Sequence, residues 1–183
     1  IMEGRMVMAE LDVYMNGYRV GIFTKINTGA HTFQYDESWL SLPGSRPISL
    51  SMPLRHQIYR GSEVYNFFDN LLPDNPEIRS KLLTRFNAGS TQPFDLLMKI
   101  GADTVGALQL LPQGTHPGNV QTIEYKALSE TTLEKILTGY QSNSPLGMIE
   151  EVDDLRISIA GAQEKTALLL NNDRWCQPLH ATP

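Results

Sequence analysis

The sequence predicts an α+β protein. Apolar and polar residues alternate over residues 11–15 and 18–24, which is the period of a β-strand. From residue 62 to residue 101 the apolar residues recur at helical spacing, and strand-like segments return after residue 105. Strands followed by a run of helices, rather than a regular alternation, predict a small antiparallel sheet with packed helices.

Composition excludes several classes of protein. The 183 residues are 41% apolar and 19% charged, which is unlike a disordered polyelectrolyte. The net charge of −5 argues against a chain that wraps nucleic acid by itself, although a local basic patch stays open. No apolar run approaches the roughly 20 residues of a membrane span. One cysteine, Cys176, excludes an internal disulfide framework and fits a reducing compartment, so we expect a cytoplasmic protein without membrane association.

The opening strands are predicted to form an antiparallel meander. Asn16 and Gly17 supply the positive φ angles of a tight hairpin turn between residues 11–15 and 18–24. The first strand is expected to be half-buried, and Tyr18, Val20 and Ile22 of the second to share one face. Residues 31–35 form a third strand. A fourth is expected over residues 48–54, where Ile48, Leu50, Met52 and Leu54 alternate with Ser49, Ser51 and Pro53.

Three helices follow. The first is expected over residues 63–71 with Ser62 as its N-cap. The second begins at Pro76, with Asp74 or Asn75 as cap, and ends near Gly89. A third short helix begins at Pro93 and is closed by Gly101. The apolar face of the first helix consists of Val64, Phe67, Phe68, Leu71 and Leu72.

The last third of the chain predicts a second strand-rich region. Strands are expected over residues 105–111, 123–126, 157–159 and 166–170, with a turn at residues 171–173 into Trp175 and Cys176. A helix over residues 130–140 should bury Leu133, Ile136 and Leu137. We expect three parts: a tag or disordered end (1–9), an N-terminal subdomain (10–141), and the start of another sheet (142–183), which is too small to be independently stable.

Several residues could carry chemistry or be purely structural. Asp69 and Asp74 could form an acid/base pair, although solvating and capping helix ends is the more common role of such residues. Phe67 and Phe68 could form a recognition patch, but aromatic residues at helical spacing usually belong to a core. Cys176 is expected to be packed rather than nucleophilic. The four histidines lie in separate segments without metal-ligand spacing, so no metal site is expected: His31, His56, His116 and His180.

The most informative segment is residues 156–166. β-Branched residues precede a small-residue turn, Ala160-Gly161-Ala162, which is followed by polar residues and an apolar strand. Small side chains let backbone N–H groups approach an anion, as in loops that cover nucleotide phosphates. A single glycine is neither a GxGxxG nor a P-loop motif, so an ordinary hairpin remains the alternative.

This segment also resembles a known family. Residues 158–165 (SIAGAQEK) resemble the phosphate-binding loop of the HipA family of serine/threonine kinase toxins. Four further segments resemble family blocks in the same order: residues 67–74 (FFDNLLPD), 92–97 (QPFDLL), 105–107 (VGA) and 145–149 (PLGMI). Together the matching blocks run from about residue 11 to the end of the chain.

The resemblance implies a function. HipA proteins are the kinase halves of bacterial toxin–antitoxin pairs; they phosphorylate glutamyl-tRNA synthetase and promote dormancy. It implies that Ser158 is an autophosphorylation site, and that the ATP phosphates are contacted by Ala160, Gly161, Ala162, Gln163, Glu164 and Lys165. It implies ATP and Mg²⁺ as cofactors of the complete kinase, and a HipB-like helix-turn-helix antitoxin as partner, through which any DNA contact is indirect.

The resemblance is incomplete towards the C-terminus. No segment resembles the family's phosphate-clamping lysine strand or its catalytic and metal-binding aspartates, and phosphoryl transfer needs these together. We therefore expect this chain to be part of a kinase with a kinase-like fold, with no catalytic residue of its own and no cofactor bound alone. The alternative is a non-catalytic module that regulates a separate kinase chain. A third possibility, a sequence-specific DNA-binding protein, lacks a basic helix and a helix-turn-helix pattern.

Overall fold

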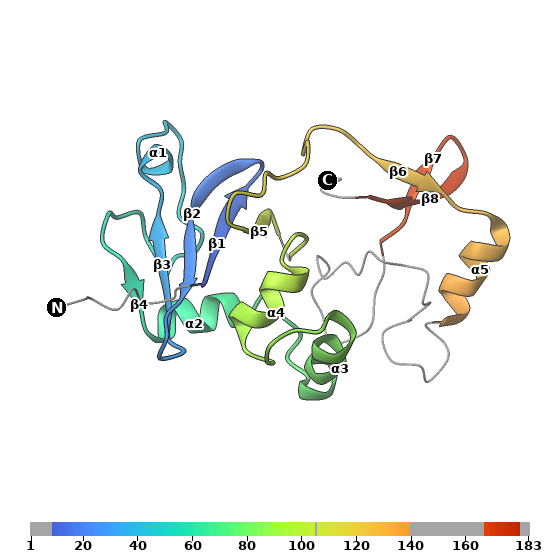
Figure 1. Ribbon diagram of the computed structural model, residues 1–183. Coiled ribbons are helices and arrows are strands. Elements are labelled where there is room, and N and C mark those ends of the chain that lie inside the picture. The colour runs from blue at the N-terminus through green and yellow to red at the C-terminus, as the bar shows by residue number, and fades with distance from the viewer. Residues whose placement is uncertain (1–8, 105, 140–166, 180–183) are drawn as a thin grey trace.

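Figure 1 shows the computed structural model, which describes residues 9–104, 106–139 and 167–179. Its main sheet is antiparallel with the strand order β4-β3-β2-β1-β5, which confirms the predicted α+β class and the opening meander. The strands are β1 (Ala9–Met15), β2 (Tyr18–Lys25), β3 (His31–Tyr35), β4 (Tyr59–Arg60) and β5 (Leu108–Pro112).

A β-bulge interrupts the regular pairing of strands β1 and β2. Between the pairs Val13–Gly21 and Tyr14–Arg19, strand β2 contains one extra residue, Val20. An extra residue changes which side chains share a face. The expected grouping is therefore wrong: Val20 is buried together with Phe23, whereas Tyr18 is 60% exposed and Ile22 is half-buried.

Strand β1 is buried on both faces, contrary to the half-buried strand that the alternation predicted. It lies between β2 and β5, and residues 11–15 are all buried, including Asp12. The Asp12 carboxylate accepts hydrogen bonds from Arg19 Nη2 (2.8 Å), Arg19 Nε (3.0 Å) and the backbone N–H of Gly114 (3.1 Å). These donors compensate for the removal of the charge from water.

The predicted strand over residues 48–54 is wrong. These residues form a turn with a single bridge between Ser49 and Met52, and β4 lies further along the chain. Met52 is fully buried, but the neighbouring apolar residue of the alternation, Leu50, is 97% exposed. Pro47 precedes the segment and Pro53 lies within it, and neither can donate a ladder hydrogen bond.

The helices follow their local signals closely. Asn75 caps α3 (Pro76–Phe86) by accepting from the N–H of Glu77, and α4 (Pro93–Ile100) ends at Gly101 as predicted. Three predicted ends are wrong by one or two residues. Helix α2 (Ser62–Asp69) includes Ser62, has Gly61 at its N-cap position and ends at Asp69 rather than at residue 71. Helix α3 is capped by the left-handed Asn87 rather than ending at Gly89. The short α1 (Glu37–Leu40) is capped by Asp36.

One hydrophobic core joins the sheet to helices α2 and α4 (Figure 1). Helix α2 contacts β3 and β4, and α4 contacts β5. Phe68 is fully buried, as the helical spacing predicted, with its ring stacked on Phe23 of β2 at 3.8 Å between centroids. Phe67 is only half-buried, at the edge of the same core.

A second, three-stranded sheet has the order β6-β8-β7. Its strands are shorter than expected: β6 (Tyr125–Ala127), β7 (Leu169–Asn171) and β8 (Arg174–Pro178), with the predicted turn at Asn172 and Asp173. Strand β6 pairs with β8, so this sheet joins residues on both sides of the boundary expected at 141/142. Helix α5 (Glu130–Gly139) buries Ile136, but Leu137 is 50% exposed, contrary to expectation. None of the helices in the described ranges is long and apolar enough to cross a bilayer.

Candidate functional site

The predicted phosphate loop lies outside the described residues. Ser158 and residues 160–165, together with the strand expected at residues 157–159, all fall between residues 140 and 166. Their assignment to ATP binding and autophosphorylation therefore stays a prediction. The described part of the chain does include the segment 67–74, which also resembled the family.

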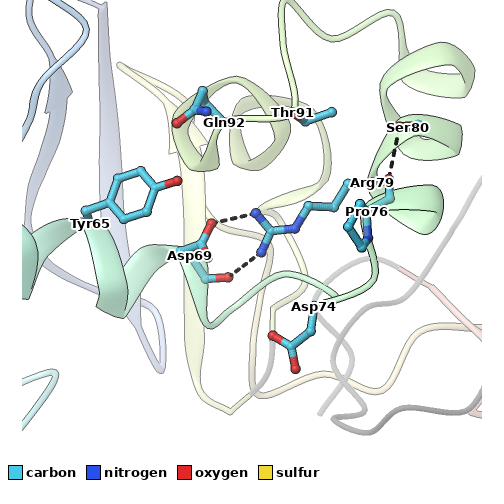
Figure 2. Close-up of a pocket in the computed structure, with 8 residues that line it drawn as sticks. All are labelled: Tyr65, Asp69, Asp74, Pro76, Arg79, Ser80, Thr91 and Gln92. Atoms are coloured by element: carbon cyan, nitrogen blue, oxygen red, sulfur yellow. Dashed lines mark hydrogen bonds and ion pairs between the residues drawn. The ribbon is translucent and has the colours of Figure 1, made fainter.

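That segment lines a polar pocket between the end of α2, the start of α3 and the residues that precede α4 (Figure 2). The pocket has a volume of about 340 Å³. It can accept a small polar group, because carboxylate, hydroxyl, amide and guanidinium groups all line it. The lining residues are Tyr65, Asp69, Asp74, Pro76, Arg79, Ser80, Thr91 and Gln92.

Arg79 is the central side chain of this pocket, and most of its donors are already used. Its Nη1 donates to Asp69 Oδ1 at 2.6 Å and its Nη2 to the Asp69 carbonyl at 3.2 Å, while Nε donates to the Pro73 carbonyl at 2.7 Å. The planar guanidinium suits such a fork of acceptors. Arg79 thus satisfies carbonyls at and after the end of α2 and fastens them to α3.

Asp69 and Asp74 both line the pocket but do not form a carboxylate pair. Asp69 faces Arg79, whereas the carboxylate of Asp74 points away from it (Figure 2). Asn75, rather than Asp74, is the N-cap of α3. Asp69 is thus part of an ion pair that joins helices α2 and α3.

A second polar cluster joins strand β2 to helix α4. Lys25 Nζ lies 2.7 Å and 2.9 Å from the two carboxylate oxygens of Asp95, and Ser90 Oγ donates to Asp95 at 2.5 Å. Burial opposes ionisation of Asp95, but the hydrogen bonds from Lys25 and Ser90 outweigh it and lower the pKa of the carboxyl group. When Lys25 and Asp95 are both charged, their ion pair holds α4 against the sheet.

Two of the histidines, His31 and His56, lie in unrelated environments. His31 is buried among aromatic rings, and His56 is an exposed side chain that pairs with Glu37 at 3.0 Å. Within the described ranges, no group of three or more histidine, cysteine, aspartate or glutamate side chains could hold a metal ion. Cys176 is a buried free thiol, with only 1% of its surface exposed.

The sequence did not reveal the residues that complete these clusters. Arg79 lies ten positions from Asp69, and Lys25 lies 70 positions from Asp95. Neither spacing is a local motif. For Arg79, a signal existed in retrospect, since an arginine one turn into a helix after an acidic helix end can reach back to it.

Comparisons with known proteins decide the family. A model described as the HipA N-terminal domain matches residues 11–111. The chain belongs to the HipA N-terminal domain family. This confirms the resemblance inferred from the sequence blocks.

Two relatives extend the match beyond this domain. A protein of Sinorhizobium fredii (strain NBRC 101917 / NGR234), named "Putative kinase Y4mE", is 31% identical over 177 residues, which is 95% of this chain and 41% of that protein. A chain of the Shewanella oneidensis MR-1 complex of HipA, HipB and operator DNA has the same fold over 94% of this chain, with a TM-score of 0.66 and 21% identity. The chain spans about two fifths of these relatives, since it covers 38% of the Shewanella chain.

Proposed function

We propose that this chain is the N-terminal part of a HipA-like toxin, a protein-serine kinase that uses ATP and Mg²⁺. The observation that carries the proposal is the 31% identity to a protein named as a kinase, which extends over 177 residues and not only over the N-terminal domain. An identity spread over 95% of the chain supports a shared activity more strongly than a shared fold alone.

The nucleotide contacts would come from residues 160–165. Small residues at Ala160, Gly161 and Ala162 leave the backbone N–H groups accessible to phosphate oxygens, and Lys165 adds a positive charge. The chemistry itself needs a metal site and a catalytic base, which we assign to the part of the relatives beyond this chain.

Ser158 would be the regulatory autophosphorylation site. It lies two positions before Ala160, and a phosphate there adds nearly two negative charges beside the loop. Like charges repel, so the phosphorylated protein would bind ATP more weakly. The name of the Shewanella complex supports a HipB-like antitoxin as partner. Glutamyl-tRNA synthetase would be the substrate.

The test uses the full-length protein with labelled ATP, Mg²⁺ and glutamyl-tRNA synthetase. We expect label on a serine of the synthetase and on Ser158, loss of the latter in Ser158→Ala, and retention in the control Ser142→Ala. The 183-residue chain alone should transfer no phosphate. Absence of transfer by the full-length protein would contradict the proposal.

A regulatory module is the alternative that the same experiment can separate. The family model matches only an N-terminal domain, and a domain of this kind could act on a separate kinase chain. If the 183-residue chain inhibits a kinase encoded beside it, and its own reading frame contains no kinase, the regulatory function replaces the catalytic one.

A further inference from the structure

The loop between α1 and β4 is positively charged. Residues 38–62 contain three arginines and no aspartate or glutamate, although the chain as a whole has 20 acidic residues and a net charge of −5. Of the two acidic residues that flank this stretch, Glu37 and Glu63, the first contacts His56 rather than an arginine. Both α1 and β4 lie on the β3 side of the main sheet (Figure 1).

Leu50 lies at the tip of this loop and is 97% exposed. It stands between two serines in the tight turn that the Ser49–Met52 bridge closes. The next apolar residue, Met52, is fully buried, so the loop buries one apolar side chain and exposes the other. A large apolar side chain held completely in water marks a candidate interaction site when it belongs to a patch.

The exposure of Leu50 is fixed by buried aromatic residues. The hydroxyl of Tyr35 accepts from the N–H of Ile48 at 2.9 Å and donates to the carbonyl of Met52 at 2.5 Å. The indole N–H of Trp39 donates to the carbonyl of Arg46 at 3.1 Å. These bonds hold the backbone on both sides of Leu50, so a partner would meet an ordered loop and little conformational entropy would be lost on binding.

The second half of the loop carries two exposed arginines, Arg55 and Arg60. Tyr59 is buried, its hydroxyl donates to the carbonyl of Pro53, and the guanidinium of Arg55 lies 3.5 Å above its ring. Ile58 is 39% exposed, and Arg60 is exposed at the end of β4. Neither Arg55 nor Arg60 forms a salt bridge within the described part of the chain. We call residues 46–60 the Leu50 loop.

We propose that the Leu50 loop is a docking surface for an acidic segment of another protein, which receives Leu50 in an apolar pocket and pairs with Arg55 and Arg60. Charge complementarity selects an acidic partner, since residues 38–62 contain no acidic residue and the exposed Arg55 and Arg60 form no salt bridge within the described ranges. The apolar tip supplies the buried anchor, and arginines are frequent at the centre of protein interfaces.

Other occupants fit the surface less well. A nucleic acid backbone would pair with the arginines but offers no apolar pocket for Leu50 or Ile58. A symmetric dimer through this loop would place the arginines of one copy against those of the other, which is repulsive. The proposal does not depend on kinase activity, and its test is separate from that of the proposed function.

The test begins with a photo-crosslinking amino acid, p-benzoylphenylalanine, at position 50 of the full-length protein in the cells that express it naturally. Mass spectrometry then identifies the crosslinked segment. A labelled synthetic peptide of that segment is titrated with the purified full-length protein and with three variants: Leu50→Ser, Arg55→Glu/Arg60→Glu, and the control Lys126→Glu/Lys135→Glu, which changes the charge equally on β6 and α5.

We expect a crosslink to an acidic segment of another protein. Its peptide should lose about tenfold or more in affinity with Leu50→Ser and with Arg55→Glu/Arg60→Glu, but not with the control. Raising the salt concentration from about 0.1 M to 0.5 M should weaken binding to the parent protein and to Leu50→Ser, but much less to the arginine variant. A crosslink to nucleic acid, to a second copy, to another part of the same chain or to a neutral or basic segment would overturn the proposal. So would the absence of any crosslink, or equal affinity of the peptide for all variants.

Discussion

His31 is a titratable residue in an apolar environment. Only 6% of its surface is exposed, and its Nε2 has no hydrogen-bond partner. Its ring lies 5.3 Å from that of Phe23 and 5.7 Å from that of Tyr65, between centroids. Burial and the positive charge of Lys25 lower the pKa of His31, and Asp95 opposes them less strongly.

This environment predicts a loss of stability on mild acidification. The unfolded chain binds a proton near the ordinary histidine pKa of 6.5, whereas folded His31 binds it only at lower pH. The unfolded state therefore gains more protons, and the free energy of unfolding falls as pH is lowered from 6.5 towards the folded pKa. His31→Phe should remove this dependence, which denaturant titrations between pH 7 and pH 5 can measure.

The exposed histidine provides the control. His56→Gln removes an exposed histidine whose surface pair with Glu37 contributes little to the free energy of unfolding, so the slope against pH should stay as in the parent protein. Asp95 does not affect the slope between pH 7 and pH 5. Because its pKa is lowered, its contribution to the free energy of unfolding is lost only as pH falls below 3.8. Equal slopes for the parent and His31→Phe would show that His31 is not responsible.

At the scale of elements, Arg79 joins helices α2 and α3. Its side chain is 13% exposed and holds one carboxylate and two backbone carbonyls. Arg79→Met would leave these acceptors without their donor in a largely buried place, which costs about 1–3 kcal/mol. Arg79→Lys should recover only part of this, because an ammonium cannot match the planar fork.

Denaturant unfolding of these variants checks the prediction, with Lys81→Gln on the same helix as the control. That substitution also removes one positive charge from α3 but no bond to α2, so its effect should stay within about 0.5 kcal/mol. If Arg79→Met and Lys81→Gln had the same small effect, the Arg79 bonds would contribute nothing to joining the helices.

The same scale shows what sequence patterns can predict. Helices α3 and α4 begin where Pro76 and Pro93 allow, because proline and cap signals act within a few residues. Residues 48–54 form a turn rather than the predicted strand because side chains outside the segment, Tyr35 and Tyr59, hydrogen-bond to its backbone. The bulge at Val20 likewise depends on how β2 pairs with β1, which the alternation within a single strand does not contain.

For the candidate site too, sequence patterns predicted some features and not others. The sequence located the segment that lines the pocket, since residues 67–74 form a recognisable block. It could not show that Asp69 is bound by Arg79 while Asp74 points elsewhere, because that depends on how two helices pack. The predicted phosphate loop, residues 160–165, lies outside the described residues and rests on its small-residue composition and on the resemblance.

At the scale of the molecule, the two sheets differ in how they are stabilised. The hydrophobic core cluster contains residues of the five-stranded sheet, its helices and the loop at Met52, but neither Ile136 of α5 nor Cys176 of β8. The three-stranded sheet closes by pairing β8 with both β6 and β7. The two sheets therefore bury separate sets of side chains, and we expect them to unfold with different free energies.

Phe68 offers the means to separate them. Its ring packs between α2 and the main sheet, stacked on Phe23 and 5.8 Å from the ring centroid of Phe33, so Phe68→Ala should cost about 3–5 kcal/mol. Hydrogen exchange should show reduced protection throughout β1, β2 and β3. The amide of Cys176 should exchange as in the parent protein, because no described residue of β6, β7 or β8 belongs to the core cluster that contains Phe68. Phe67→Ala, at the edge of the core, is the matched control with a smaller effect. Parallel loss of protection in β8 would mean instead that the two sheets unfold as one cooperative unit.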